Sequence, residues 1–180
     1  ARDKHIKTAL KKLGVKVITC NSALLHEPWD IVNKAGSHFK VFTPYWRHCL
    51  RHMQLRPLYT IEHWPEKHAI ASDCLDDWDL LPSKPNWAKS FHEYWQPGEQ
   101  GAIRQLDSFL SNSLNQYKLA RDKPSQLGTS CLSAHLHFGE ISPQQIWLAV
   151  QQQMQEPDCN LTAAHSFLSE LGWREFSYHL

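Results

Sequence analysis

Six prolines fall between Asn21 and Asn86, and this density limits what the segment can fold into. Each proline fixes φ and removes a backbone donor, so long regular helices and central strands are disfavoured. Aromatic side chains such as Trp29, Tyr45 and Trp64 alternate with the prolines, which is typical of a segment packed against a surface. The segment contains little glycine, which argues against a flexible linker. We therefore predict an ordered connector with short helical turns over residues 25–90.

Helices are predicted in the second half of the chain. After Gly101, apolar residues recur at steps of three and four, which is typical of an amphipathic helix. These residues are Ile103, Leu106, Phe109, Leu110, Leu114 and Tyr117. A loop is predicted from Arg121 to Ser130. Ser142 can cap a second helix, with Pro143 in its first turn, and a further helix is predicted from about Thr162 onward.

The start of the chain has a different pattern. Residues 3–13 are predicted to form a helix that ends at Gly14, and residues 15–19 alternate like a short strand. A helix, a glycine and a β-branched strand are typical of the last unit of a parallel α/β sheet. The chain begins within a charged helical stretch and stops at Leu180 without a residue that ends a helix. We therefore expect a piece of a longer protein.

Composition excludes few functions. Nineteen Lys and Arg against 18 Asp and Glu leave a formal charge of +1, so charge alone does not indicate nucleic acid. The five cysteines lack the spacing of a zinc site, and His135 and His137 have no further ligands beside them, so no metal is expected. Scattered thiols favour a reduced protein of the cytoplasm, such as the bacterial cytosol. No apolar run is long enough to cross a membrane.

Residues 128–133 are rich in hydroxyl groups and begin with Gly128. Hydroxyls and free backbone N–H groups can donate to phosphate oxygens, so such a loop can wrap a phosphate. The competing interpretation is an ordinary Ser/Thr loop that caps the following helix. Composition alone leaves both interpretations open.

Glu170, Trp173, Arg174 and Ser177 lie at positions i, i+3, i+4 and i+7, so they share one side of the last predicted helix. A carboxylate, an indole, a guanidinium and a hydroxyl form a wall suited to a polar, aromatic ligand. The alternative is a surface ion pair between Glu170 and Arg174, worth roughly a few tenths of a kcal/mol, with the indole packed beside it.

Four segments, in order and with fitting spacing, resemble the photolyase/cryptochrome family. They are Lys40–Arg47 (KVFTPYWR), Trp95–Glu99 (WQPGE), Gly128–Trp147 (GTSCLSAHLHFGEISPQQIW) and Glu170–Phe176 (ELGWREF). The resemblance covers nearly the whole chain and implies a mainly α fold. Residues 1–24 would be the end of an N-terminal α/β, Rossmann-like antenna domain. Residues 25–90 would be an interdomain connector, and residues 91–180 the N-terminal half of a helical FAD-binding domain.

The resemblance also implies two sets of site residues. Those expected to contact FAD are Tyr117, Thr129, Ser130, Cys131, Leu132, Ser133, Phe167 and Arg174. Those expected to contact DNA or its lesion are Arg121, Glu170, Trp173, Arg174 and Ser177. Cys131 stands where the family often has Arg, so only its backbone is expected to serve, and Phe167 stands where Trp is frequent. An antenna chromophore, folate or deazaflavin, would be bound mostly by sequence outside this chain.

The implied function is a deoxyribodipyrimidine photolyase of the class I type, a monomer that repairs cyclobutane pyrimidine dimers in damaged DNA by light-driven electron transfer from reduced FAD. Glu170 resembles these repair enzymes, whereas (6-4) photolyases and animal cryptochromes tend to have Gln. Glu175, in place of Asp, argues against the single-strand-preferring cryptochromes. No catalytic residue is expected here, because the bond cleavage belongs to the cofactor, and the chain alone is expected to be inactive. The alternatives are a cryptochrome-type blue-light photoreceptor without repair activity and a helical interaction domain without a cofactor.

Overall fold

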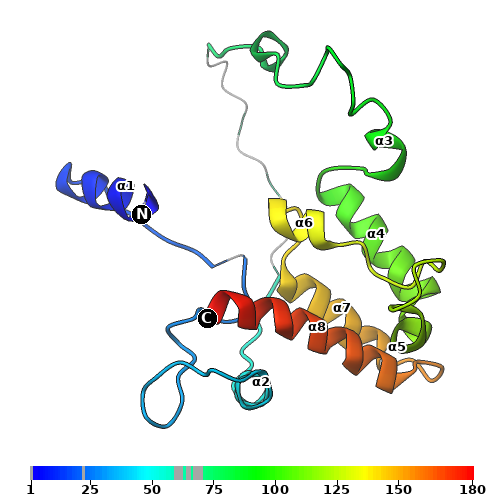
Figure 1. The fold of residues 1–180 in the computed structure, drawn as a ribbon. Helices are drawn as coiled ribbons and strands as arrows, with labels where there is room; N and C mark the ends of the chain where they lie inside the picture. Colours follow the sequence, from blue (N-terminus) through cyan, green and yellow to red (C-terminus); the bar gives the residue numbers. More distant parts are fainter. Residues whose placement is uncertain (1, 22, 59–62, 64–65, 67–70) are drawn as a thin grey trace.

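The computed structural model describes residues 2–21, 23–58, 63, 66 and 71–180, and this part of the chain is mainly helical (Figure 1). In chain order the elements are α1 (Arg2–Lys12), α2 (Phe42–Arg51), the 3-10 turn η1 (Leu75–Trp78), α3 (Phe91–Tyr94), α4 (Glu99–Asn112), the 3-10 turn η2 (Leu114–Gln116), α5 (Tyr117–Ala120), α6 (Ser133–Phe138), α7 (Pro143–Gln153) and α8 (Leu161–His179). The prediction of a mainly α fold is confirmed. Among the described helices, none has both the length and the apolar character needed to cross a bilayer.

The core lies where α4, η2, α5 and α7 meet α8 (Figure 1). The predicted apolar stripe faces this core, because Leu106, Phe109, Leu114 and Tyr117 are each at most 6% exposed. Each buried Leu or Phe contributes about 1.5–3 kcal/mol through burial. Ile103 differs from the prediction, since it is 37% exposed. Most positions of the predicted apolar stripe are therefore buried, as expected.

The stripe is divided between three short elements. α4 ends at Asn112, and η2 and α5 continue after Ser113. Ser and Asn side chains compete for backbone groups and so favour turns over helix interiors. The Ser113 hydroxyl donates to the carbonyl of Leu127 at 3.0 Å, and the Asn115 amide donates to the carbonyl of Asp158 at 3.2 Å. These polar contacts fix a bend that brings Tyr117 to the start of its own helix.

Side-chain caps fix the starts of α7 and α8. Ser142 accepts from the backbone N–H of Gln145 at 3.1 Å, and the Gln145 side chain accepts from the N–H of Ser142 at 2.8 Å, which makes a capping box. Asn160 caps α8 by accepting from the N–H of Ala163 at 3.2 Å. The predicted helix starts at Ser142 and near Thr162 are confirmed. The six-residue helix α6 was not predicted.

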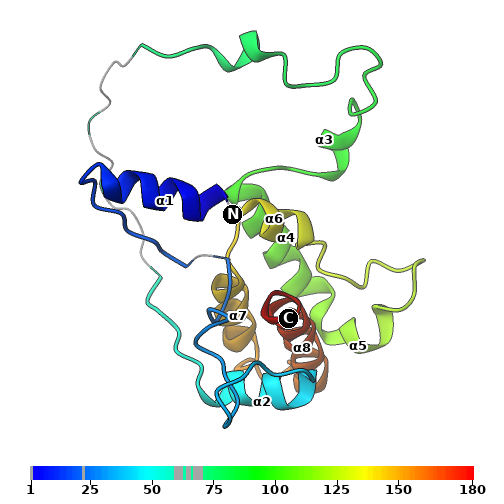
Figure 2. The same ribbon diagram turned by 60° about the vertical axis from the view of Figure 1, so that its left-hand side comes forward.

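The predicted connector contains one full helix as well as short turns. α2 has ten residues, and Pro44 fits because it lies in the first turn, where its missing N–H has no partner to lose. α2 lies across α8 (Figure 2), and Tyr45 and Cys49 are buried there against Phe176. Trp29 is 71% exposed, so not every aromatic of the segment is an anchor. Trp64, another predicted anchor, lies outside the described residues.

The predicted N-terminal helix is confirmed, but the predicted strand is wrong. α1 ends in a Schellman motif, in which Val15 donates to the carbonyl of Leu10 and Gly14, at φ +74°, donates to that of Lys11. Residues 15–19 form no strand, and none occurs elsewhere among the described residues. The physical reason is that a strand is defined by hydrogen bonds to a neighbouring strand, and the described chain offers no partner.

Gly172 allows α8 and α2 to approach closely. A Cβ atom at this position would lie 2.7 Å from two carbons of the Trp46 indole, closer than van der Waals contact permits. We expect Gly172→Ala to destabilise the protein by about 1–3 kcal/mol through overpacking. The better helix propensity of Ala offsets up to about 1 kcal/mol of this. Thermal unfolding measures the effect, with His165→Ala, exposed on the same helix, as control. A melting temperature as high as that of the parent would contradict the close approach.

Candidate functional site

A cavity of about 150 Å³ lies between α5, the 128–133 loop, α7 and α8. The residues that line it are Tyr117, Ser130, Leu132, Ser133, Leu136, Ile146, Phe167, Glu170, Leu171 and Arg174. Seven of these ten were predicted as site residues, from two sets expected to serve different ligands. The fold therefore brings together side chains that are up to 57 positions apart, between Tyr117 and Arg174.

The inner wall of the cavity is aromatic. The Tyr117 ring meets Phe167 edge-on, with centroids 5.3 Å apart, and meets Phe109 in the same way at 5.8 Å. Phe109 and Phe167 lie 4.6 Å apart and complete the cluster. Such edge-to-face pairs add about 0.5–1.5 kcal/mol beyond burial. Burial raises the pKa of the Tyr117 hydroxyl, so that hydroxyl stays protonated and can donate a hydrogen bond.

An ion pair stands at one side of the cavity. Arg121 contacts the Glu170 carboxylate, and the guanidinium carbon lies 5.5 Å from the centroid of the Tyr117 ring. The hydrogen bond to Glu170 raises the pKa of Arg121. The expected alternative, an ion pair between Glu170 and Arg174, is wrong, because the partner of Glu170 comes from the end of α5. The two predicted DNA-contacting residues Arg121 and Glu170 are thus adjacent in space.

The hydroxyl-rich loop does not cap the helix that follows it. α6 has Leu132 as its N-cap and no side-chain capping bond. Ser130 and Ser133 line the cavity, and no hydrogen bond of either hydroxyl occurs within the described residues. Gly128 permits the tight entry, since a Cβ there would lie 2.5 Å from the Cβ of Ala120. The capping interpretation of this loop is therefore wrong.

Thr129 and Cys131 point to the other side of the loop. Their side chains lie 3.6 Å apart (Oγ1 to Sγ), and Cys131 has φ +53°, in the left-handed region. Both residues line a second cavity of about 810 Å³, whose remaining walls include Tyr94, Trp95 and Phe109. The predicted loop residues therefore divide between two cavities, with Ser130, Leu132 and Ser133 on one side.

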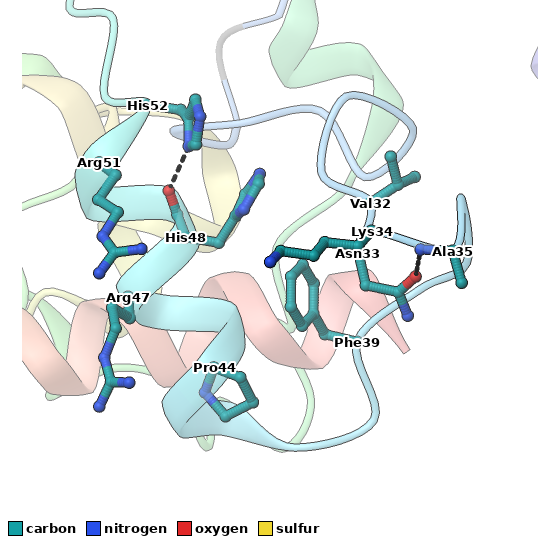
Figure 3. Close-up of a pocket in the computed structure, with 10 residues that line it drawn as sticks. All are labelled: Val32, Asn33, Lys34, Ala35, Phe39, Pro44, Arg47, His48, Arg51 and His52. Carbon is teal, nitrogen blue, oxygen red and sulfur yellow. Dashed lines mark hydrogen bonds between the residues drawn. The ribbon is translucent and has the colours of Figure 1, made fainter.

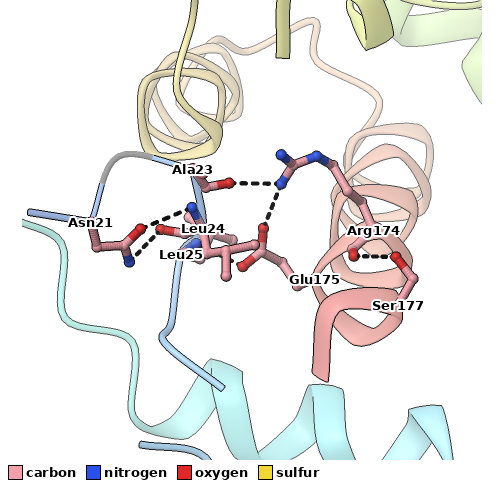
Figure 4. Close-up of polar contacts among 7 residues, drawn as sticks. All are labelled: Asn21, Ala23, Leu24, Leu25, Arg174, Glu175 and Ser177. Carbon is pink, nitrogen blue, oxygen red and sulfur yellow. Dashed lines mark hydrogen bonds and ion pairs between the residues drawn. The ribbon is translucent and has the colours of Figure 1, made fainter. Parts of the chain in front are cut away.

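Arg174 is held by a segment that sequence reasoning did not connect with the site. Its Nη1 atom donates to the carbonyl of Ala23 at 2.9 Å and to Oε1 of Glu175 at 3.0 Å (Figure 4). Oε2 of Glu175 accepts from the N–H of Leu25 at 2.7 Å. Ser177 donates to the carbonyl of Arg174 at 2.6 Å, so its hydroxyl is used within the helix. The segment around residues 23–25 thus positions a side chain of the cavity.

Glu175 is a buried carboxylate at this contact. Its side chain is 0% exposed, and burial raises its pKa to about 7. The N–H of Leu25 and the Arg174 guanidinium oppose this rise, because both stabilise the ionised form. One feature of the sequence could have indicated this buried carboxylate. Glu175 lies on the apolar side of the last helix, three residues after Gly172 and one after Arg174.

Trp173 lies outside the cavity, on the face of α8 that meets α2. Its ring stacks on Phe42 with centroids 3.8 Å apart and planes 10° apart, and the side chain is still 47% exposed. Phe176 meets it edge-on at 5.9 Å. The predicted shared face of α8 is therefore split in two. Glu170 and Arg174 face the cavity, whereas Trp173 lies half exposed beside α2.

Comparison with known proteins gives consistent results. A family model described as DNA photolyase matches residues 1–68. A deoxyribodipyrimidine photo-lyase of Agrobacterium fabrum (strain C58) is 39% identical over 187 residues, which cover 100% of this chain and 38% of that protein. Cryptochrome-1 of Arabidopsis thaliana is 29% identical over 189 residues, 99% of this chain and 27% of that protein.

Two solved structures are similar to this one. The crystal structure of a bacterial class III photolyase from Agrobacterium tumefaciens matches with a TM-score of 0.83 and 37% identity, over 99% of this chain and 37% of that chain. A cryptochrome of Synechocystis sp. PCC6803 matches with a TM-score of 0.71 and 21% identity, over 98% of this chain and 38% of that chain, which shows the likeness of the fold alone. The chain thus spans less than two fifths of the length of these four proteins.

Proposed function

The chain belongs to the photolyase/cryptochrome family, and we propose that it is part of a deoxyribodipyrimidine photolyase, which repairs cyclobutane pyrimidine dimers in DNA with light and reduced FAD. One observation carries the proposal beyond family membership. Seven of the residues expected to bind the flavin or the lesion line one small cavity, although they come from three separate segments, α5, the 128–133 loop and α8. In this proposal, residues 1–24 are the end of an α/β antenna domain, and residues 91–180 are the N-terminal half of the helical FAD-binding domain. Residues 25–90 form the connector between these two domains.

The residues at the cavity fit part of an FAD molecule. Ser130 and Ser133 hold hydroxyls without a partner in the described chain, and Tyr117 keeps its proton, so all three can donate to phosphate or ribityl oxygens. A volume of about 150 Å³ is below the roughly 300–1,000 Å³ of whole-ligand pockets, so this cavity would take a phosphate or the part of the cofactor next to it. Arg174 would add a positive charge, and the backbone at Cys131 would add an N–H.

When bound, FAD would supply the redox chemistry, and the protein would supply position, dryness and charge. Tyr117 and Phe167, packed against Phe109 behind them, give the cavity an aromatic wall that disfavours water. Arg121 fixes the Glu170 carboxylate in place through their ion pair. A fixed carboxylate can accept hydrogen bonds from the N–H groups of pyrimidine bases that have left the duplex. Arg121 itself is part exposed and would also reach a DNA phosphate.

Trp173 would supply the stacking surface for the extruded dimer. Its indole is held by stacking on Phe42. The side chain is also about half exposed, so a base can reach it. A preorganised aromatic surface loses little entropy when a base stacks on it. Damaged, poorly stacked bases leave the duplex at lower cost than normal bases, which favours the lesion.

Within the family, the match to a class III photolyase favours that class over the class I type expected from the motifs. The second candidate is a cryptochrome-type photoreceptor, favoured by the 29% identity to Cryptochrome-1. We also propose that the full-length protein carries an antenna chromophore, folate or deazaflavin, and that it is a monomer of the cytosol.

The absorption spectrum of the full-length protein and its light-dependent repair of dimer-containing DNA test the proposal. Flavin absorption without repair would favour the photoreceptor, and a colourless protein that stays apo with added FAD would exclude both.

Trp173→Ala tests the lesion surface in the full-length protein. Loss of one base–aromatic stack weakens binding by roughly 1–3 kcal/mol, about five- to a hundred-fold in affinity. Dimer-containing DNA should lose this affinity, whereas undamaged DNA, bound mainly through phosphates, should lose far less. Paired binding titrations at one salt concentration measure the two losses, with flavin content checked in both proteins. Equal losses on both DNAs would assign Trp173 to packing against Phe42.

A further inference from the structure

His179, the last residue of α8, holds a loop of the connector through one nitrogen of its ring. The backbone N–H of Phe39 donates to Nε2 of His179 at 2.9 Å. Phe39 ends the loop of residues 32–39, which forms a cleft of about 790 Å³ together with α2 (Figure 3). Among the residues that the structure describes, no other hydrogen bond joins this loop to a different element. Hydrogen bonding therefore fastens the 32–39 loop at His179 alone within that part of the chain.

The 32–39 loop is closed on itself by Asn33. The side chain of Asn33 accepts from the N–H groups of Ala35 at 2.9 Å and Ser37 at 3.1 Å, and Figure 3 shows the first of these bonds. The N–H of Asn33 also donates to the carbonyl of Ser37 at 2.8 Å. Because these bonds lie within the loop, they persist when the bond to His179 breaks. The loop can therefore detach from α8 as a unit.

The bond from Phe39 fixes the protonation state of His179. A ring nitrogen that accepts a hydrogen bond carries no proton, so the imidazole is neutral and its proton lies on Nδ1. Nδ1 is buried and has no hydrogen-bond partner among the described residues, and His179 is only 4% exposed. A protonated ring would turn one N–H against the N–H of Phe39 and leave the other buried without an acceptor. Protonation of His179 is therefore incompatible with the attachment of the loop.

The surroundings of His179 favour the neutral ring. The titratable groups on the elements packed around it are His38 of the loop, Tyr45, His48 and Cys49 of α2, and Glu175 one turn earlier on α8. Burial raises the pKa values of Tyr45 and Cys49, so both stay neutral. Glu175 directs its two oxygens to Leu25 and Arg174. Burial, and then the neighbouring His38, lower the pKa of His179.

The attachment at His179 also supports the start of α2. Two residues after Phe39 the chain enters α2 at Phe42, whose ring stacks on Trp173. The Phe39 ring packs against Tyr45 and His48 of the same helix, with centroids 6.2 and 5.3 Å apart. Detachment of the loop would therefore remove a support from the first turn of α2, on which Trp173 rests.

We propose that His179 is a positioning residue that acts as a proton-sensitive latch. The neutral ring, with its proton on Nδ1, fastens the 32–39 loop to α8, and the protonated ring releases the loop and loosens the first turn of α2. The latch goes beyond the proposed function and does not depend on it, since it involves only contacts within the chain.

Release of the loop should develop as the pH falls. In the released state the ring is in water and titrates near its ordinary pKa of 6.5, whereas the pKa of the latched ring is lower. The attachment is therefore complete above pH 6.5 and is lost as the pH falls from 6.5 through the pKa of the latched state. Within this window, the ratio of released to attached loop should rise by up to about tenfold for each pH unit.

Hydrogen–deuterium exchange of the full-length protein between about pH 8 and about pH 5 tests the latch, after correction for the intrinsic pH dependence of exchange. In the parent, protection of the amides of residues 33–39 should fall by up to about tenfold per pH unit below 6.5, whereas protection of α7 should stay constant. His179→Gln should keep the loop protected at every pH, because its side-chain oxygen can accept from Phe39 and does not titrate. His179→Phe keeps a ring without an acceptor, so its loop should already be released at about pH 8.

Two matched variants assign the titration to His179. His165→Gln removes an exposed histidine from the same helix and should keep the pH profile of the parent. His38→Gln removes the neighbouring ring and should keep most of that profile. Loop protection that stays constant with pH in the parent would overturn the proposal. A pH profile that persists in His179→Gln, or that disappears in His38→Gln, would do the same, because another group would then control the loop.

The tautomer of His179 is a separate check on the parent protein itself. Its ring nitrogen resonances can be assigned by their absence from either His179 variant. At about pH 8 they should show a proton on Nδ1 and an unprotonated Nε2. A proton on Nε2 at this pH would contradict the latch whatever the exchange rates, because Nε2 could then not accept from Phe39.

Discussion

Replacing both Thr129 and Ser130 by Ala should leave the full-length protein largely without FAD. The family resemblance assigns both hydroxyls to the flavin, and a hydrogen bond to a charged partner is worth about 1.5–3 kcal/mol. Ser130, which lines the smaller cavity, would therefore account for roughly one to two orders of magnitude in affinity, and a contact from Thr129 would add a similar amount. Flavin absorbance relative to protein absorbance after purification measures the loss, and calorimetry with added FAD measures the affinity.

The structure indicates that this double change would not unfold the loop. Thr129 is exposed, and its one described side-chain contact is to Cys131 at 3.6 Å. The Ser130 backbone carbonyl, which accepts from Gln105 at 2.9 Å, is kept in the variant. Ser111→Ala with Thr162→Ala removes the same two hydroxyl types from exposed positions on α4 and α8 and serves as control. Unchanged flavin loading in the loop variant would show that these hydroxyls do not hold the cofactor.

The two single variants should not be equivalent. Ser130 lines the cavity with Tyr117 and Ser133, whereas Thr129 faces the larger cavity with Trp95. If the phosphates lie in the smaller cavity, Ser130→Ala should account for most of the loss. If Thr129→Ala accounts for most of it, the cofactor passes on the other side of the loop, where Phe109 and Trp95 offer ring surfaces.

Local signals in the sequence were sufficient for the helices of the second half. The capping box at Ser142 and the cap at Asn160 act within one turn, so the starts of α7 and α8 can be read from neighbouring residues. Gly14 ends α1 for the same reason, since its positive φ is a local property. The strand at residues 15–19 failed because strand formation depends on a partner that local sequence does not contain.

The site was predicted in part, and the missing part is tertiary. Helical periodicity placed Glu170 and Arg174 on one side of α8, and the structure brings both to the cavity. It could not tell that Arg121 would pair with Glu170, or that Ala23 would bind Arg174 from 151 positions away. Stacking of Trp173 on Phe42 also joins segments far apart in sequence, so no pattern within α8 could indicate it.

Titration of Glu175 should make the protein less stable as the pH rises from 5 to 8. Burial raises the pKa of this carboxyl to about 7 in the folded state, above its ordinary value of 4.5. An acid with a raised pKa stabilises the fold fully below pH 4.5, and this contribution is lost as the pH rises through 7. At 1.36 kcal/mol per pH unit, the difference between the two pKa values corresponds to about 3 kcal/mol, of which about 2–3 kcal/mol falls between pH 5 and 8.

Comparison of Glu175→Gln with the parent isolates this titration. His26, His48 and His179 have pKa values lowered by burial, so their contribution is lost as the pH falls, opposite to that of Glu175. Glu140 has a lowered pKa as well, through the N–H of Gly98 and the ring of His135, and its contribution too is lost on acidification. These contributions are the same in both proteins and cancel in the difference, as in the control Glu93→Gln on exposed α3.

The sign of that difference tests whether Glu175 is the group that couples α8 to the segment around Leu25. In urea unfolding of the full-length protein, parent minus variant should fall by about 2–3 kcal/mol from pH 5 to pH 8. Gln can still accept from the N–H of Leu25, but its amide cannot replace the carboxylate toward Arg174, so the variant should also hold Arg174 less firmly. Weaker flavin binding in the variant at pH 8 would therefore accompany the stability change. A difference that stays constant with pH would mean that Arg174 and the backbone N–H groups of Leu25 and His26 keep Glu175 ionised throughout, and that its burial is fully compensated.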